Sequence, residues 1–329
     1  MRYYNLSLFQ PGSTTPIKVW ESHPNGVFNP NAQNIEFDVP VVPADTEIGG
    51  ATITIEGNSL KDLLSAQQYT GLLAQLSGGM KNGLPLANST QSGVLVSGPI
   101  FQSFGNWEGT EMTLDLVIVP GFFAYDNPGN IVLNWLSGTP LSDALQNTLT
   151  TAFPTLPPPQ ITIGQIIQQH DEVARYSKLE QLATFLSGIT SAKGTPVRIV
   201  LQGGTIYVTD STFAPPPKQI LPTDLIGQPT WIAPNLMQMK VVMRGDLYIG
   251  SNITMPSSLM NAPGIIFTLG SALPSQIKYS STFSGSFTVI EMRHLGNFRS
   301  QDGAQWATIM NCVPNGWQLL KTLDSENAQ

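Results

Sequence analysis

Two proline triplets constrain the fold of this chain most strongly, and they lie at residues 157–159 and 215–217. Three consecutive prolines supply no backbone N–H donors and favour the extended polyproline II conformation, so they continue neither a helix nor a central strand. We interpret them as rigid connectors. Together with the turn around Asn127-Pro128-Gly129, they predict three domains, at residues 1–127, 128–217 and 218–329.

The two outer parts of the chain are predicted to be mainly β. Residues 51–55 and 112–118 alternate apolar and polar side chains, as a strand with one buried face does. In the last part, a long strand at 283–294 is expected to pair with 305–312, and 236–244 with 246–249. One helix is expected at 59–67, with Ser59 as its cap and with Leu60, Leu63 and Leu64 forming an apolar stripe.

The middle part is predicted to be α+β. Thr139 is expected to cap a helix whose leucine stripe runs to Phe153, and Ser177 to open a second helix with an S-x-x-E capping box, ending at Gly188. A β-hairpin follows at 197–208, with a Gly-Gly turn. The fold class is therefore α+β and mainly β, with two β-barrel-like domains flanking a central α+β domain.

The composition bounds the possible partners. Hydrophobic residues make up 41% of the 329 residues, which suffices for sizeable cores, but charged residues make up only 11%, against about 25% in ordinary domains. Either partners cover much of the surface, or the surface is polar and uncharged; both interpretations stay open. The net charge of −7 and the 15 scattered basic residues argue against stable nucleic-acid binding.

Cys312 is the only cysteine, so neither an intrachain disulfide nor a multi-cysteine metal site is expected. Its apolar neighbours predict a small buried side chain. The first residues lack the apolar region of a signal peptide, and no apolar run reaches the roughly 18 residues of a membrane helix. We therefore expect no membrane insertion.

The histidines give little indication of chemistry. His23, His170 and His294 lie far apart and show no metal-ligand spacing. The triplet His170-Asp171-Glu172 is interpreted as a solvated entry to the second helix rather than as an acid–base pair. Arg293, His294 and Arg299 form the one basic cluster, which suits at most a salt bridge to another chain or a phosphate contact.

Glu108 and Glu111 flank a Gly-Thr turn beside Trp107, and paired carboxylates near an aromatic residue are also found in sugar-cleaving sites. A charged hairpin turn is the favoured interpretation. The sequence thus predicts no catalytic, cofactor-binding or metal-binding residue and no enzyme. The alternative function is a virion-associated or secreted carbohydrate-active enzyme, or a glycan-binding β-protein with exposed tryptophans.

The glycine-rich block at 78–121 carries a family resemblance, which further motifs extend along the chain. In order, these are Gly78-Gly79-Met80, GLPLAN at 83–88, 101–118, PLSDALQNTLTTAFP at 140–154, Asp171-Glu172 with Tyr176, and 284–300 followed by Trp306. In this pattern the chain resembles the baseplate hub proteins of contractile-tailed bacteriophages, of the Mu-like class.

The resemblance implies a structural subunit of the virion, assembled in the host cytoplasm. Such hubs are homotrimers whose β-barrel domains form a ring of pseudo-sixfold symmetry, with the α+β region outside it. The ring joins the hexameric tail tube, or a distal tube-initiator protein, to the trimeric central spike, and it contacts other baseplate proteins. DNA passes through its lumen without stable binding, and no cofactor is implied.

Overall fold

The computed structural model describes residues 1–46, 50–81, 89–120, 129–210, 212, 215–233, 235–256, 283 and 285–315. The motif at 83–88 lies outside these residues. The described chain is rich in strands and contains two long helices, which confirms the α+β, mainly β class. The barrel-like shape of the outer parts stays a prediction.

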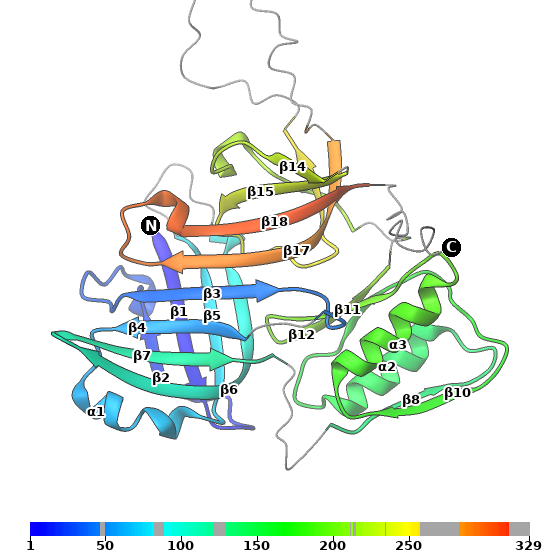
Figure 1. The fold of residues 1–329 in the computed structure, drawn as a ribbon, viewed down its shortest axis with the longest axis horizontal. Helices are drawn as coiled ribbons and strands as arrows, with labels where there is room; N and C mark the ends of the chain where they lie inside the picture. The colour runs from blue at the N-terminus through cyan, green and yellow to red at the C-terminus, as the bar shows by residue number, and fades with distance from the viewer. Residues whose placement is uncertain are drawn as a thin grey trace, which may run out of the picture.

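One sheet of thirteen strands dominates the structure (Figure 1). Its strands follow the order β14-β15-β18-β17-β3-β4-β7-β6-β5-β1-β2, and β16 joins β17 and β13. The bounds are β1 Arg2–Phe9, β2 Pro16–Glu21, β3 Ile35–Val41, β4 Ala51–Glu56, β5 Leu73–Met80, β6 Gly93–Glu108, β7 Glu111–Ile118, β13 Lys218–Gln219, β14 Thr230–Ala233, β15 Leu236–Val242, β16 Asn252–Met255, β17 Gly285–Asn297 and β18 Trp306–Pro314.

The sheet turns a corner within β6. The first half of this 16-residue strand pairs with β5, and its second half pairs with β7, with a bulge between Ile100 and Gln102. A bulge bends a strand and increases its twist. As a result, β5, β1 and β2 lie behind β3, β4 and β7 and run across them (Figure 1). The inner faces of the two layers enclose a common core.

The first and last parts of the chain share that core. β3 pairs antiparallel with β17, from Glu36 opposite Asn297 to Val41 opposite Met292. The long strand expected after residue 283 and its partner are confirmed as β17 and β18. One hydrophobic cluster contains buried residues of both parts, such as Ile53 and Val289. The three-domain division stays a prediction.

The middle part has its own core, between α2, α3 and two small sheets (Figure 1). The bounds are β8 Ile131–Trp135, α2 Leu141–Ala152, β9 Gln160–Thr162, β10 Glu172–Tyr176, α3 Leu179–Ser191, β11 Arg198–Gln202 and β12 Thr205–Thr209. The expected leucine stripe of α2 is confirmed, since Leu141, Leu145 and Leu149 are buried.

The predicted hairpin is confirmed as β11 and β12, and it belongs to both cores. Gly203 and Gly204 form its turn with φ angles of 58° and 80°, which glycine adopts without strain. Because successive side chains of a strand point to opposite faces, Ile199 packs into the middle core and Val200 into the large core. The hairpin therefore connects the middle part to the large sheet.

The helix ends differ from the prediction. Pro140, not Thr139, is the N-cap of α2, because the Thr139 hydroxyl donates instead to the Leu136 carbonyl at 2.6 Å. Ser177 does not form the capping box, since its N–H and hydroxyl both donate to Gln181 at 3.0 Å. The helix α3 continues through Gly188 to Ser191.

The first helix is shorter than predicted, and one predicted hairpin is wrong. Ser59 caps α1 (Leu60–Leu64) as expected, by accepting from the Asp62 N–H, but α1 buries none of its residues. Residues 246–249 form no strand, and β15 pairs with β14 and β18 instead. Short 3₁₀ helices lie at Pro24–Gly26, Ala66–Tyr69, Ser89–Gln91, Pro222–Asp224 and Gly303–Gln305. Across the described residues, helices capable of spanning a membrane are absent.

Candidate assembly surfaces

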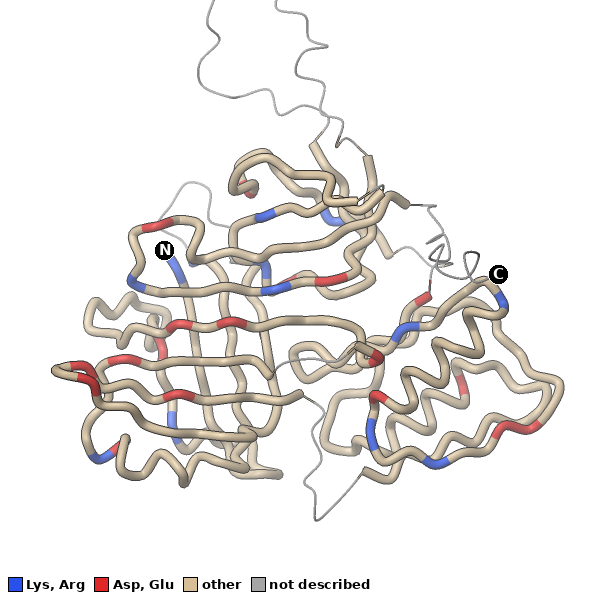
Figure 2. The backbone as a smooth tube through the Cα atoms, viewed as in Figure 1, with Lys and Arg blue, Asp and Glu red and all other residues tan. Residues whose placement is uncertain are grey.

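The outer face of the large sheet points away from the core. In β3, β4 and β7, alternate residues such as Ile35, Ile53 and Leu116 are buried in the core, so the residues between them point outward. In Figure 1 no helix lies over this face. Carboxylates gather on its N-terminal half and at the end of the β6–β7 hairpin (Figure 2): Glu36, Asp38, Glu56, Glu108, Glu111 and Asp115.

Hydrogen bonds between strands order the centre of this acidic face. Asp115 on β7 accepts from the Thr54 hydroxyl of β4 at 2.5 Å and from the Asn106 amide of β6 at 2.8 Å. Both donors are uncharged side chains. Asp38 differs, because Arg293 of β17 binds it through two nitrogens, with Nε to Oδ1 at 2.7 Å. Arg293, one of the two arginines of the basic cluster, therefore has an ion-pair partner within the chain.

Glu108 and Glu111 stand opposite each other at the end of the β6–β7 hairpin. Gly109 makes the turn with φ 61°, and the Trp107 indole N–H donates to its carbonyl at 2.9 Å. All of these residues are exposed, and Trp107 retains 64% of its accessible surface. The charged turn is confirmed, and no enclosed site surrounds the two carboxylates that the carbohydrate-active alternative requires.

The three histidines lie in separate environments. His23 Nδ1 is 2.8 Å from the buried Ser22 hydroxyl, and burial lowers its pKa. His170 Nε2 lies 3.6 Å from Glu172 Oε2, at the start of strand β10, so the predicted helix entry is wrong. His294 is fully buried, and desolvation lowers its pKa to about 4. Among the described residues no cluster of three or more metal-ligating groups occurs.

Cys312 is buried on β18, as predicted, and burial raises the pKa of its thiol. A thiol held in its neutral form is a poor nucleophile. The basic cluster also separates in the structure, because His294 points into the core while Arg293 is exposed, and Arg299 donates to the carbonyls of Pro30 and Ala32.

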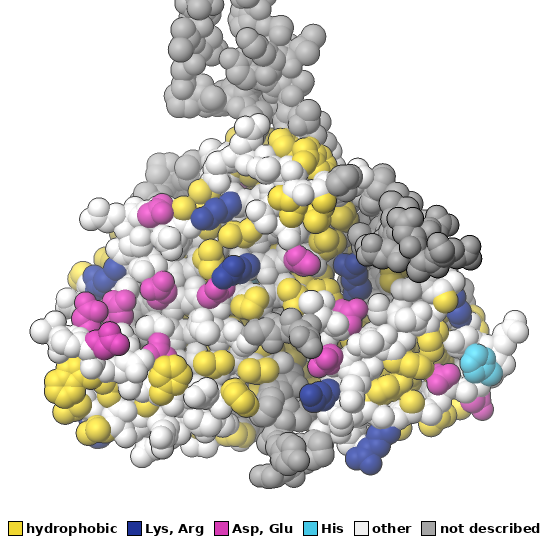
Figure 3. Space-filling view, in the orientation of Figure 1, with side chains coloured by type: hydrophobic (Ala, Val, Ile, Leu, Met, Phe, Trp, Pro, Cys, Tyr) yellow, Lys and Arg dark blue, Asp and Glu magenta, His cyan; other side chains and the backbone are white. Residues whose placement is uncertain are grey.

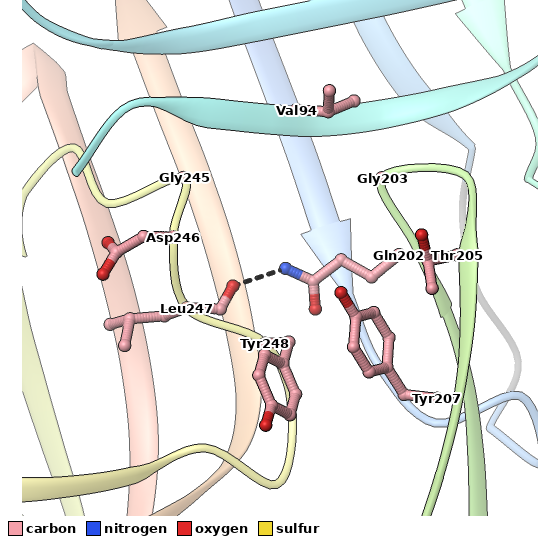
Figure 4. A pocket seen from close by; sticks show the side chains of 9 residues that line it. All are labelled: Val94, Gln202, Gly203, Thr205, Tyr207, Gly245, Asp246, Leu247 and Tyr248. Atoms are coloured by element: carbon pink, nitrogen blue, oxygen red, sulfur yellow. Dashed lines mark hydrogen bonds between the residues drawn. The ribbon is translucent and has the colours of Figure 1, made fainter. Parts of the chain in front are cut away.

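A pocket of about 140 Å³ lies where three segments of the chain meet (Figure 4). Val94 of β6 lines one side, the β11–β12 hairpin a second, and residues 245–248 a third. The Gln202 side chain donates to the Leu247 carbonyl at 2.7 Å, and the Tyr207 and Tyr248 rings stack at 4.5 Å. These contacts hold the middle part against the large sheet.

Glycines make this junction possible, and of these the sequence analysis indicated only those of the β11–β12 turn. A side chain on Gly93 would overlap the Gly245 backbone, and one on Gly203 would come within 2.9 Å of the Val94 carbonyl oxygen. At the first contact β6 meets the residues after β15, and at the second it meets the tip of the β11–β12 hairpin. No sequence spacing indicates them, because the paired positions are more than one hundred residues apart.

No protein-family model and no curated protein sequence matches this chain. Several solved structures are similar to it. The tail protein from Neisseria meningitidis MC58 is 11% identical, with 96% of this chain and 97% of that chain covered and a TM-score of 0.47. The 43 kDa tail protein of prophage MuSo2 from Shewanella oneidensis is 6% identical, with 96% and 99% covered and a TM-score of 0.49.

A third similar structure is the E. coli c3393 protein, a type VI secretion component with structural similarity to the T4 bacteriophage tail proteins gp27 and gp5. It is 9% identical, with 94% of this chain and 76% of that chain covered and a TM-score of 0.49. The chain is thus similar over nearly its whole length to phage tail proteins and to a protein that resembles them.

Proposed function

We propose that this chain is a structural subunit of a phage tail baseplate hub. Three copies form a ring of pseudo-sixfold symmetry that joins the hexameric tail tube, or a tube-initiator protein, to the trimeric central spike. The protein acts by shape and assembly, not by catalysis, and its place is the virion tail after assembly in the host cytoplasm.

The observation that carries the proposal is the single sheet built from both ends of the chain. The resemblance assigns the N-terminal and C-terminal parts to the ring, and β3 and β17 pair directly across these two parts. A shared core and a continuous sheet make them one rigid unit. A subunit that transmits load between a tube and a spike requires such a unit.

The acidic outer face suits a wall past which DNA moves. Nucleic acid binds where Lys and Arg replace its counterions, whereas a field of carboxylates repels phosphates. Glu36, Glu56 and Asp115 lie on neighbouring strands of this face, and none of them forms an ion pair with another described residue. We assign this face to the lumen and the middle part, with its separate core, to the outside of the ring.

The proposal is tested by mass and by location. Native mass spectrometry of the purified chain is expected to give three times the 35.5 kDa of one subunit. Cryo-electron microscopy of tails is expected to place it between tube and spike. A chain that stays monomeric at all concentrations and never enters tail particles contradicts the proposal.

A further inference from the structure

The first and last parts of the chain contain the same arrangement of five strands. In the first part the order within the sheet is β3-β4-β7-β6-β5, and in the last part it is β14-β15-β18-β17-β16. Strands at the same place in the two orders also follow one another in the same sequence along the chain, from β3 and β14 to β7 and β18. All neighbouring pairs are antiparallel. The last part therefore repeats the strand plan of the first.

The corner strands β6 and β17 correspond in this plan, and they differ in what lies along one edge. Each pairs with an earlier strand through its first residues and carries a bulge near its middle. Beyond the bulge, residues 292–297 of β17 pair with β18 on one edge and with β3 on the other. Residues 103–108 of β6 pair with β7 on one edge and with no described strand on the other.

Exposure distinguishes the paired edges from the open ones. The strand β3 buries alternate residues, whereas all four residues of the corresponding β14 are exposed. Met292, His294 and Gly296 of β17 are buried, whereas Ser103 alone is buried in residues 103–108 of β6. An open edge presents unpaired N–H and C=O groups to any other strand that approaches it. The second half of β6 and β14 are therefore the two open edges that this plan leaves in one copy.

Apolar side chains accompany both open edges. Phe104 of β6 is 39% exposed and stands opposite Asp115, so it points to the outer face. Trp231 and Ile232 of β14 are 39% and 49% exposed. Figure 3 shows hydrophobic side chains near the end of the β6–β7 hairpin and again near β14. Both edges thus combine unpaired backbone groups with apolar surface, which favours burial against another chain.

The directions of the strands fit a ring. Eight strands lie side by side from one open edge to the other, in the order β6-β7-β4-β3-β17-β18-β15-β14 (Figure 1). Neighbours in this row are antiparallel, so its first and last strands run in opposite directions. Rotation about an axis along the strands keeps these directions. It therefore brings β14 of one copy antiparallel to β6 of the next, as β3 is to β17 within a copy.

Pairing across the sheet also gives the register. From the residue after each bulge, the rows of paired residues are Gln102, Val117, Thr52 and Asp38 in the first part and Glu291, Asn311, Gln238 and Thr230 in the last. Thr230 therefore corresponds to Asp38, which stands opposite Leu295 of β17. Asn106 of β6 lies as far beyond its bulge as Leu295 does.

We propose that β14 of one copy pairs antiparallel with residues 103–108 of β6 in the next copy, with Thr230 opposite Asn106. The pairing satisfies the backbone groups of both edges and covers Phe104 and Ile232. It joins two different surfaces, and such heterologous contacts close into a ring when the rotation between copies allows it. The acidic face then continues from copy to copy. This inference rests on the proposed trimer and names the strands that form it.

Paired cysteines test the contact, because the native Cys312 is buried and alone. A chain with Asn106→Cys and Thr230→Cys, once oxidised, is expected to give a covalent trimer of three times 35.5 kDa on a non-reducing denaturing gel. A disulfide within one copy is excluded, since the two positions lie about 34 Å apart at a strand spacing of ~4.8 Å.

The matched control carries Thr52→Cys and Thr230→Cys. Thr52 is also exposed on the outer face, but it lies on β4, two strands away from the open edge of β6. Its sulfur does not reach β14 of the next copy, so the control is expected to give at least about 10-fold less covalent trimer. Thermal unfolding and native mass spectrometry of the reduced variants check that both are folded and assembled like the wild type.

The outcomes separate this inference from the proposed function. If the wild type is trimeric and the pair at 106 and 230 gives no more covalent trimer than the control, the edge contact is overturned and the trimeric hub stands. A ladder of products beyond three subunits supports the edge contact and overturns the closed trimer. A monomeric wild type whose cysteine variants form no cross-links overturns both.

Discussion

Arg293 and His294 are neighbours on β17, yet they occupy opposite environments. Arg293 lies on the outer face, is exposed and binds Asp38 of β3. His294 lies on the inner face, has no accessible surface, and shares one hydrogen bond with the Thr308 hydroxyl, Nδ1 to Oγ1 at 2.9 Å. Its Nε2 has no partner in the described structure.

The difference shows how the sheet distributes its few charges. Burying a charge costs far more than burying a neutral polar group, so the inner position holds a neutral imidazole. The outer position holds an ion pair at little cost because water solvates it. Side chains on the inner face therefore serve packing, and side chains on the outer face are free to interact with charged groups.

The largest effect is expected from the inner face of β7. Leu116 is fully buried, and Leu116→Ala is expected to lower the free energy of unfolding by about 2–5 kcal/mol, since it leaves a cavity. Val117, its neighbour on the outer face, is the control, and Val117→Ala is expected to cost below about 1 kcal/mol. Urea unfolding at one protein concentration measures both. Equal losses would mean that the outer face is also packed against something.

A lower pH is expected to reduce the stability of the fold, and His294 is the group responsible. Its pKa is about 4 in the fold and 6.5 as a free side chain, because desolvation disfavours the charged form. Between these values the unfolded chain binds a proton that the folded chain does not. Stability is therefore complete above pH 6.5 and falls as the pH drops to 4, by about 3 kcal/mol in total.

The measurement is the unfolding free energy between pH 7 and pH 4, compared with His294→Gln. Carboxylates titrate in both proteins, so the difference between the two curves isolates the histidine. Over this window the unfolding free energy of the wild type is expected to fall more steeply with decreasing pH. The difference in slope corresponds to about one additional proton bound on unfolding. Parallel curves would show that His294 is already accessible to protons in the fold.

A smaller effect is expected at Gly296, on the inner face next to Leu295. A side chain there would overlap the Phe37 ring, which is buried and packs edge-on against Trp306 at 5.3 Å. Gly296→Ala is expected to cost about 1–3 kcal/mol through overpacking. Adding Phe37→Leu is expected to return part of the loss, and thermal unfolding measures both. A fully stable Gly296→Ala variant would show that the core here is looser than the structure indicates.

Local pattern predicted much of this sheet and its β17–β18 pair, but it did not predict that β3 pairs with β17. The alternation in β4 and β7 assigned inner and outer faces correctly, because a one-residue slip would expose every apolar side chain. The leucine stripe of α1 did not indicate where the helix lies, and none of its residues is buried. A helix of five residues is too short for periodicity to distinguish a core from an interface.

The candidate surfaces depend on long-range contacts that no local pattern contains. β3 meets β17 across some 250 residues, and Gly93 meets Gly245. The sequence located Trp107, Glu108 and Glu111 on a charged turn, but it did not indicate that Arg175 lies at an exposed position of β10. Such placement follows from tertiary packing, which decides which faces of short strands remain uncovered.

The smallest effect is expected from the ion pair on the outer face. A double-mutant cycle with Asp38→Asn and Arg293→Gln is expected to give a coupling energy below about 1 kcal/mol, because both side chains are solvated. The coupling is expected to shrink further in about 1 M salt, where the screening length is ~3 Å. A coupling of several kcal/mol that resists salt would show that water is excluded from this face. In that case the outer face at β3 and β17 is covered in the assembly under study, and its assignment to an open lumen fails there.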